Sequence, residues 1–230
     1  MLRTIRRRSL AKLRSQIEPV DGATYARFLP AWQHVRADGA ADDPRVDDSD
    51  GLLTVVDQLA GFPVPASALE TLVLPARIRG YQPRMLDEAM SRGDVLWTGS
   101  GTIPGQDGWV SLHLAESADL TVPPEPPQRL EDLSDDARKV FDAMGEGADF
   151  LPRIAARAGL ALGTAGDALW DLVWAGLVTN DTAGPLRAFL DGGKSAHARP
   201  KAPGRSRSRG RRGAGRIATA RLGRRPMGSL

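Results

Sequence analysis

The sequence contains no cysteine among its 230 residues. Without thiols there is no disulfide framework and no thiolate metal site, which suits a reducing compartment. Long hydrophobic runs are also absent: no apolar stretch approaches the roughly 18 residues that a membrane span needs. The Arg-rich N-terminus is not followed by the apolar segment of a signal peptide. We therefore expect a cytoplasmic protein with no membrane association.

Residues for metal or acid–base chemistry are sparse. The three histidines, His34, His113 and His197, lie far apart and have no acidic partner at ligand spacing, so we expect packing or solvated roles for them. No G-x-x-x-x-G-K-[ST] phosphate loop is present. We therefore predict no catalytic residue, no metal site and no cofactor in this chain.

The net charge of +3 conceals a marked asymmetry. Residues 191–230 hold 12 Lys/Arg and one acid, whereas residues 1–190 hold 19 Lys/Arg and 27 Asp/Glu, a net charge of −8. The C-terminal region is rich in Gly, Ala, Ser, Pro and Arg, and it has too few large apolar residues to offset the entropy of folding. We expect residues 191–230 to form a disordered, Arg-rich tail, and basic tails often contact nucleic acid.

The first part of the chain, residues 1–36, is predicted to be a helical segment. Apolar residues at helical spacing from Leu2 to Ile17 predict a helix over 2–17 that ends before Pro19. A second helix is expected over 23–29, ending at Pro30. Residues 37–50 are acidic and aperiodic, which is typical of a solvated linker.

Residues 51–118 have the pattern of three helices followed by a β-hairpin. Helices are predicted over 51–59, 66–74 and 83–91, and strands over 95–98 and 109–114 on either side of a glycine-rich loop. This order indicates a winged helix, in which a helix-turn-helix is followed by a hairpin called the wing.

The pattern repeats after a Pro-rich linker at residues 119–132. Residues 133–190 are predicted to form a second winged helix, with Ser134 capping a helix that ends at Met144. Further helices are expected over 150–158 and 164–175, and a short wing over 177–179 and 186–190. The predicted fold class is therefore α+β, mainly α, with tandem winged-helix modules and a disordered basic C-terminal tail.

Long stretches of the chain resemble the C-terminal region of the Lhr (large helicase-related) ATP-dependent DNA helicases. They are RRRSLAKLRSQIEPV (6–20), YARFLPAWQHV (25–35), GLLTVVDQLAGFPVPASALETLVLPARIRGYQP (51–83), GDVLWTGSGTIPGQDGWVSLH (93–113) and ALWDLVWAGLVTNDT (168–182). The resemblance covers about residues 2–190. It implies a parent helicase that moves 3′→5′ on single-stranded DNA, uses ATP and Mg, and takes part in DNA repair.

The resemblance also implies that the motor lies N-terminal to this segment. The winged helices of the family are accompanied by a β-barrel and are similar to those of DNA glycosylases. This chain departs from the family pattern because it has neither a phosphate loop nor a DEAD/DEAH-like box. We therefore expect no ATPase activity from the chain alone, and we expect it to be a fragment or a truncated product.

Nine basic residues are the candidate DNA contacts. They are Arg6, Arg7, Arg8, Lys12, Arg14, Arg77, Arg79, Arg84 and Arg92. For Arg84 and Arg92, the alternative is an ordinary surface role with pairing to Asp87 and Glu88. The third helix of the second module has acids but no bases, so we expect it to pack rather than to read DNA. Aromatic residues of the wing and of that helix are expected to pack in the core: Trp97, Trp109, Trp170 and Trp174.

The function predicted from these features is a non-motor DNA-binding segment that holds single-stranded DNA or a duplex junction beside the motor domains. A DNA glycosylase is an alternative, but it needs a carboxylate or a Gln-x-Gln-like site, and Gln82, Gln106 and Gln128 are isolated. A winged-helix transcriptional regulator is a third possibility. The acidic third helices and the lack of a ligand-binding domain argue against it.

Overall fold

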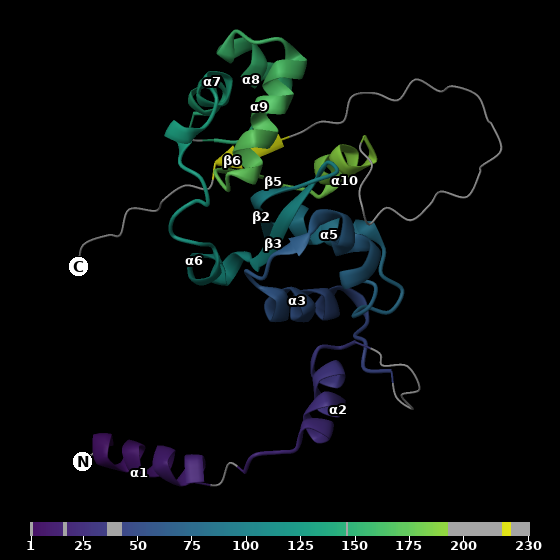
Figure 1. Cartoon of the computed structure of the whole chain (residues 1–230), viewed down its shortest axis with the longest axis vertical. Coiled ribbons are helices and arrows are strands. Elements are labelled where there is room, and N and C mark those ends of the chain that lie inside the picture. The colour runs from purple at the N-terminus through teal and green to yellow at the C-terminus, as the bar shows by residue number, and fades with distance from the viewer. Residues whose placement is uncertain (1, 16–17, 36–42, 146, 193–217, 222–230) are drawn as a thin grey trace, which may run out of the picture.

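The computed structural model describes residues 2–15, 18–35, 43–145, 147–192 and 218–221 (Figure 1). Two exposed helices, α1 (Leu2–Ser15) and α2 (Gly22–Trp32), form an arm at the N-terminal end. The carboxylate of Asp21 caps α2 by accepting the Thr24 backbone N–H at 2.6 Å. The helix continues beyond its predicted end at Leu29, because Pro30 lies in the last turn and removes only one hydrogen bond there. No helix in the described ranges is long and apolar enough to cross a bilayer.

The first module contains the predicted helices and hairpin. Its elements are α3 (Asp48–Leu59), β1 (Val64–Pro65), α4 (Ala66–Ala68), the π-helical η1 (Leu69–Val73), α5 (Pro83–Ser91), β2 (Val95–Ile103) and β3 (Asp107–Leu114). The strands form an antiparallel sheet in the order β1-β3-β2. Helices α3 and α5 pack against this sheet (Figure 1). This is a winged-helix arrangement, as the sequence predicted.

Two predicted boundaries in this module are wrong. Helix α3 begins within the expected linker 37–50, because the Asp48 carboxylate accepts the backbone N–H groups of Asp50 and Gly51, and negative charge is favoured at a helix N-terminus. The expected wing loop 99–108 is mostly strand. A register shift between Gly99 and Thr102 bends the hairpin, and only the turn from Pro104 to Gln106 remains.

The second half of the chain resembles the first in its order of elements, except that helix α10 lies between its last two strands. Two short 3-10 helices, η2 (Ala115–Ser117) and η3 (Leu130–Asp132), and helix α6 (Ala118–Thr121) connect the halves. Then follow α7 (Asp135–Met144), β4 (Asp149–Phe150), α8 (Leu151–Ala158), α9 (Leu162–Trp174), β5 (Val178–Asn180), α10 (Gly184–Asp191) and β6 (Ala218–Arg221). The sheet order β4-β6-β5 matches β1-β3-β2 in the first half. The predicted cap is confirmed, since Ser134 Oγ accepts the Ala137 N–H at 3.1 Å.

The predicted strand at 186–190 is wrong, because these residues belong to helix α10. Pro185 stands in the first turn, and Leu186, Phe189 and Leu190 follow at helical spacing. The third strand of this sheet is instead β6, which lies within the predicted tail 191–230. The other residues assigned to that tail, 193–217 and 222–230, lie outside the described residues.

The two halves share one continuous core. Their buried side chains form a single cluster, and α9 and β5 lie against β2 (Figure 1). The hydroxyl of Thr179 on β5 donates to the backbone oxygen of Trp97 on β2. Trp97 and Trp174 are buried as predicted, whereas Trp109 on β3 is 39% exposed. The halves are therefore docked onto each other along the wing of the first.

Candidate nucleic-acid interface

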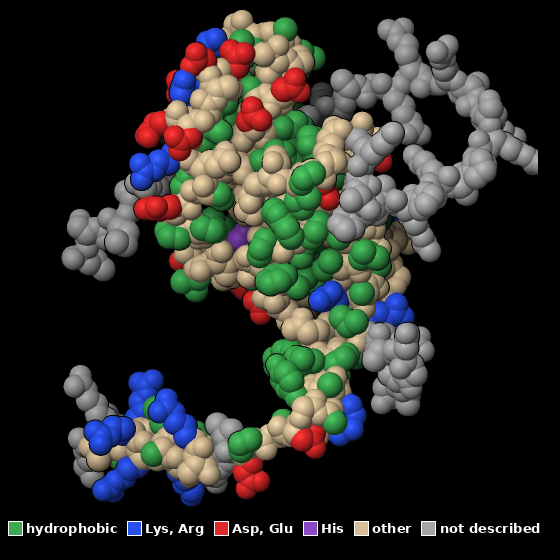
Figure 2. Space-filling view, in the orientation of Figure 1, with side chains coloured by type: hydrophobic (Ala, Val, Ile, Leu, Met, Phe, Trp, Pro, Cys, Tyr) green, Lys and Arg blue, Asp and Glu red, His purple; other side chains and the backbone are tan. Residues whose placement is uncertain are grey.

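The largest group of predicted DNA contacts lies on α1. All its described side chains from Thr4 to Ser15 are exposed, and basic side chains surround the helix at the end of the molecule away from α5 (Figure 2). The predicted residues on this helix are Arg6, Arg7, Arg8, Lys12 and Arg14. Helix α1 contains no acidic residue, so its charge is not neutralised within the helix.

Helix α5 presents a second, weaker basic face. Its inner side chains, among them Leu86, are buried, while Arg84, Glu88 and Arg92 are exposed at intervals of four residues. Arg92 pairs with Asp94, with Nε 2.8 Å from Oδ2, and not with the acids of its own helix. The exposed face of α5 therefore carries two positive charges and one negative charge.

Arg77 and Arg79 precede α5 but differ in exposure. Arg77 is half-buried, its Nη1 donates to the Val73 backbone oxygen at 3.0 Å, and burial lowers the pKa of its guanidinium. Arg79 is exposed and pairs with Asp47, with Nε 3.0 Å from Oδ1. The structure thus gives Arg77 a packing role and leaves Arg79 on the surface. Both residues precede α5 in the first module, and α1 lies apart from this module (Figure 1).

The third helix of the second half, α9, is occupied by a protein contact. A Cβ added at Gly99 would lie 2.3 Å from the Val173 oxygen, and one added at Gly108 would lie 2.4 Å from the Trp174 ring. Glycine is needed at both positions to let the wing and α9 approach so closely. On the exposed side of α9, burial and the neighbouring Asp167 raise the pKa of Asp171. The prediction that this helix packs agrees with the contact.

Gly99→Ala is therefore expected to lower the free energy of unfolding by about 1–3 kcal/mol, the usual cost of overpacking. The matched control is Gly163→Ala on α9, where a Cβ meets nothing within 4 Å. Alanine favours a helix over glycine, so this control should be neutral or stabilise by up to about 1 kcal/mol. Urea denaturation followed by circular dichroism measures both. Equal stabilities for the two variants would contradict the tight contact at Gly99.

Helix α10 fastens the second half to the first through one arginine. Arg187 pairs with Glu70 of η1 at 2.6 Å and with Asp87 of α5 at 2.7 Å. The Tyr81 hydroxyl also donates to Glu70, at 2.6 Å, and burial together with this bond raises the pKa of Tyr81. The charge of Asp87 is thus balanced within the protein. Sequence reasoning missed this partner, because Arg187 lies 100 positions away.

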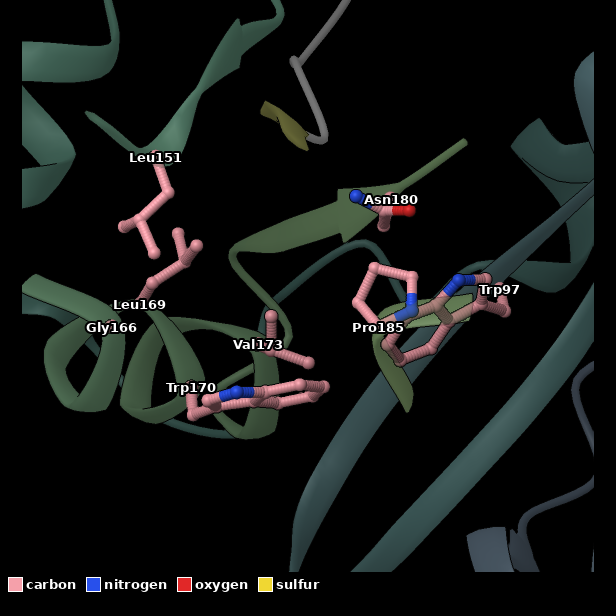
Figure 3. Close-up of a pocket in the computed structure, with 8 residues that line it drawn as sticks. All are labelled: Trp97, Leu151, Gly166, Leu169, Trp170, Val173, Asn180 and Pro185. Atoms are coloured by element: carbon pink, nitrogen blue, oxygen red, sulfur yellow. The ribbon is translucent and has the colours of Figure 1, made fainter. Parts of the chain in front are cut away.

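A small cavity lies where the halves meet (Figure 3). Its volume is about 50 Å³, and its lining comes from β2, α8, α9, β5 and α10: Trp97, Leu151, Gly166, Leu169, Trp170, Val173, Asn180 and Pro185. An apolar cavity that holds a benzene ring measures about 150 Å³, so this one is too small for a nucleobase. No carboxylate lines it. The cavity therefore offers no group for cleaving a glycosidic bond.

Charge is separated along the chain. Residues 1–35 contain seven Lys/Arg and two Asp/Glu, a net charge of +5, whereas residues 43–190 contain 11 Lys/Arg and 23 Asp/Glu, a net charge of −12. Acidic side chains gather around α7, and basic ones around α1 (Figure 2). This distribution favours the approach of a polyanion to α1 and disfavours its approach to residues 43–190.

Comparison with known proteins agrees with the fold. The winged-helix domain family of large helicase-related proteins matches residues 20–115. A "Lhr helicase/ probable uracil glycosylase" of Mycolicibacterium smegmatis is 46% identical over 213 residues, which are 89% of this chain and 14% of that protein. A "Lhr helicase/uracil glycosylase" of Escherichia coli is 38% identical over 226 residues, 92% of this chain and 15% of that protein.

The chain thus spans about one-seventh of the length of these curated relatives. The family match covers α2, the whole first module and its wing. The two alignments extend the similarity over most of the chain. This chain is therefore homologous to the part of the Lhr helicases that contains their winged-helix domain.

Proposed function

We propose that this chain is a non-motor DNA-binding segment of an Lhr-type, 3′→5′ ATP-dependent DNA helicase that acts in DNA repair. It holds single-stranded DNA or a duplex junction beside the motor domains, mainly through phosphate contacts. The observation that carries this proposal is the exposed, acid-free basic helix α1 beside an acidic body, residues 43–190. A helix with this charge binds the DNA backbone without reading its sequence.

The second half is a second winged helix in this proposal. The similar element order and the matching sheet order support it. Its third helix, α9, covers the wing of the first module and is not free to enter a DNA groove. In this proposal the second half therefore positions the first module and keeps the two modules in a fixed orientation.

ATP and Mg belong to the motor domains in this proposal, and the chain itself binds neither. The sequence has no phosphate loop to hold the nucleotide. The relatives are also named as uracil glycosylases, but the cavity between the modules has no carboxylate and gives no support for that activity here. Helicase chemistry is thus assigned to the motor domains of the longer relatives.

Replacing Arg6, Arg7 and Arg8 by Gln in the full chain should weaken DNA binding and its dependence on salt. Each lost phosphate contact lowers the slope of log affinity against log salt by about 0.7–0.9. Three lost contacts should therefore flatten the slope by about two units. Fluorescence anisotropy with a labelled oligonucleotide at several salt concentrations measures both quantities.

A matched control removes the same charge from the linker and the second module through Arg129→Gln, Arg138→Gln and Arg153→Gln. If both triple variants weaken binding equally, the affinity reflects net charge, and the assignment to α1 is wrong. Deleting the C-terminal region is a poorer test, since it would also remove β6 from the second sheet.

A further inference from the structure

Helix α2 exposes a row of large apolar side chains that the fold does not use. Tyr25, Phe28, Leu29 and Trp32 lie at positions i, i+3, i+4 and i+7, which places them on one face of the helix. They are 54%, 49%, 36% and 58% exposed. The rings of Phe28 and Trp32 are stacked, with their centroids 5.6 Å apart. This face, called here the aromatic face, lacks a buried residue.

The aromatic face is held in place at its C-terminal end. Gln58 of α3 donates from Nε2 to the Trp32 backbone oxygen at 2.9 Å. The His34 ring Nδ1 lies 3.0 Å from the backbone oxygen of Pro44. Each hydrogen bond joins a polar side chain to a backbone oxygen and does not involve an aromatic ring, so the bonds attach the end of α2 to the body and leave the rings exposed. Hydrophobic side chains gather on the side of α2 that faces the open space beside α1 (Figure 2).

The charge around this face indicates what covers it. Residues 1–35 carry a net charge of +5, and six of their seven Lys/Arg lie on α1, the other helix of the arm. Arg27, by its helical spacing, lies on the opposite side of α2 from the aromatic face. Aromatic rings beside a basic helix fit single-stranded nucleic acid, whose bases stack on the rings while its phosphates contact the cations. Paired bases in a duplex cannot stack in this way, because their faces are covered by their neighbours.

We infer that the aromatic face of α2 is a stacking site for unpaired bases of DNA, with Tyr25 and Trp32 as the contacting rings. This inference rests on the proposed function, and it adds to α1 a site that selects single strands. The basic helix binds phosphates of any DNA, and α2 supplies the preference for unpaired bases. Phe28 stacks on Trp32 and so holds the Trp32 ring in position.

The double variant Tyr25→Leu/Trp32→Leu of the full chain tests this site. Leucine keeps the face apolar but cannot stack on a base. One base stacked on an aromatic ring contributes about 1–3 kcal/mol, so each substitution should cost at least about fivefold in affinity for single-stranded DNA. We expect the two effects to multiply, so that the dissociation constant for a dT20 oligonucleotide rises at least about 25-fold. Affinity for a 20-base-pair hairpin duplex should change less than twofold.

A conservative variant and a stability measurement complete the test. Tyr25→Phe/Trp32→Phe keeps both rings and should bind dT20 within about threefold of the parent. Because both side chains are exposed, the melting temperature of the leucine variant should stay within a few degrees of the parent.

The outcomes separate this inference from the proposed function. If the leucine variant binds dT20 like the parent while the Arg6/Arg7/Arg8 variant is weakened, the stacking site is overturned, the face is assigned to a protein contact, and DNA binding stands. If the leucine variant loses affinity equally for dT20 and for the hairpin duplex, the preference for unpaired bases is overturned. A parent chain that binds neither DNA would overturn both proposals.

Discussion

Leu86→Ala is expected to lower the free energy of unfolding by about 2–5 kcal/mol, the usual cost of truncating a buried leucine. Leu86 is fully buried on α5, which packs against α3 and β2. Removing its side chain leaves a cavity in the core of the first module. Urea denaturation followed by circular dichroism measures this loss.

Arg84→Ala, on the exposed face of the same helix, is the matched control. It should change stability by less than about 0.5 kcal/mol, as most surface substitutions do. Arg92→Ala should behave similarly, because an exposed ion pair such as Arg92–Asp94 contributes little. If the two arginine variants destabilise the protein as much as Leu86→Ala, the division of α5 into a packing face and a surface face is wrong.

The same arginines also test whether α5 contacts DNA. A hydrogen bond to a charged group contributes on the order of 1 kcal/mol or more, so each alanine variant should weaken DNA binding about fivefold if this face is engaged. Binding equal to that of the parent for both variants would make α5 structural. The DNA contact would then rest on α1 alone.

Lowering the pH from about 6.5 to about 4 should destabilise the protein through His113. This side chain is fully buried, with Nε2 3.0 Å from the Thr98 hydroxyl and Nδ1 2.9 Å from the Thr121 hydroxyl. Burial lowers the pKa of His113 from its ordinary 6.5 to about 4. The ring is therefore neutral in the folded protein at physiological pH.

The protein loses stability at low pH because its unfolded state takes up a proton at His113 before the folded state does. Between pH 6.5 and 4 the unfolded chain binds a proton at His113 and the folded chain does not, so stability falls as the pH falls. One pKa unit corresponds to about 1.4 kcal/mol, so the loss from this residue reaches at most about 3 kcal/mol near pH 4. Below pH 4 both states are protonated, and the residue adds no further loss.

The variant His113→Gln isolates this effect, since glutamine does not titrate. It should be less stable than the parent at pH 7.5, because it replaces a buried ring that contacts two threonines. Between pH 6.5 and 4 its stability should fall less steeply than that of the parent. The carboxylates titrate in both proteins and cancel in the difference. Parallel curves of unfolding free energy against pH would contradict the lowered pKa.

Short-range patterns were enough to predict the elements of the first module. The helices containing Leu52, Leu69 and Leu86 place apolar residues at helical spacing, and the hairpin strands have glycine between them. Ser134 was identified as a cap because a cap acts within three residues of its own position. The exposure of the basic residues on α1 also followed from their number and spacing.

Longer-range features could not be predicted in this way. Strand β6 is a segment of only four residues, and its partners in β4 and β5 lie about 40 to 70 positions earlier. Because β6 supplies the third strand, residues 186–190 are free to follow their helical pattern and form α10. The sequence around Leu186 fits a short strand or a short helix, and the tertiary structure selected the helix.

The sequence by itself therefore determined the local elements, the family resemblance and the separation of charge between α1 and the acidic body, because these depend on residues that are neighbours in the chain. Only the tertiary structure decided which surfaces are free. It placed α9 over the wing, where Gly99 and Gly108 allow close approach, and it paired Arg187 with Glu70 and Asp87. These contacts join residues about 65 to 120 positions apart, whose proximity arises only when the modules dock. In the described part of the chain, α1, the aromatic face of α2 and the outer face of α5 stay exposed.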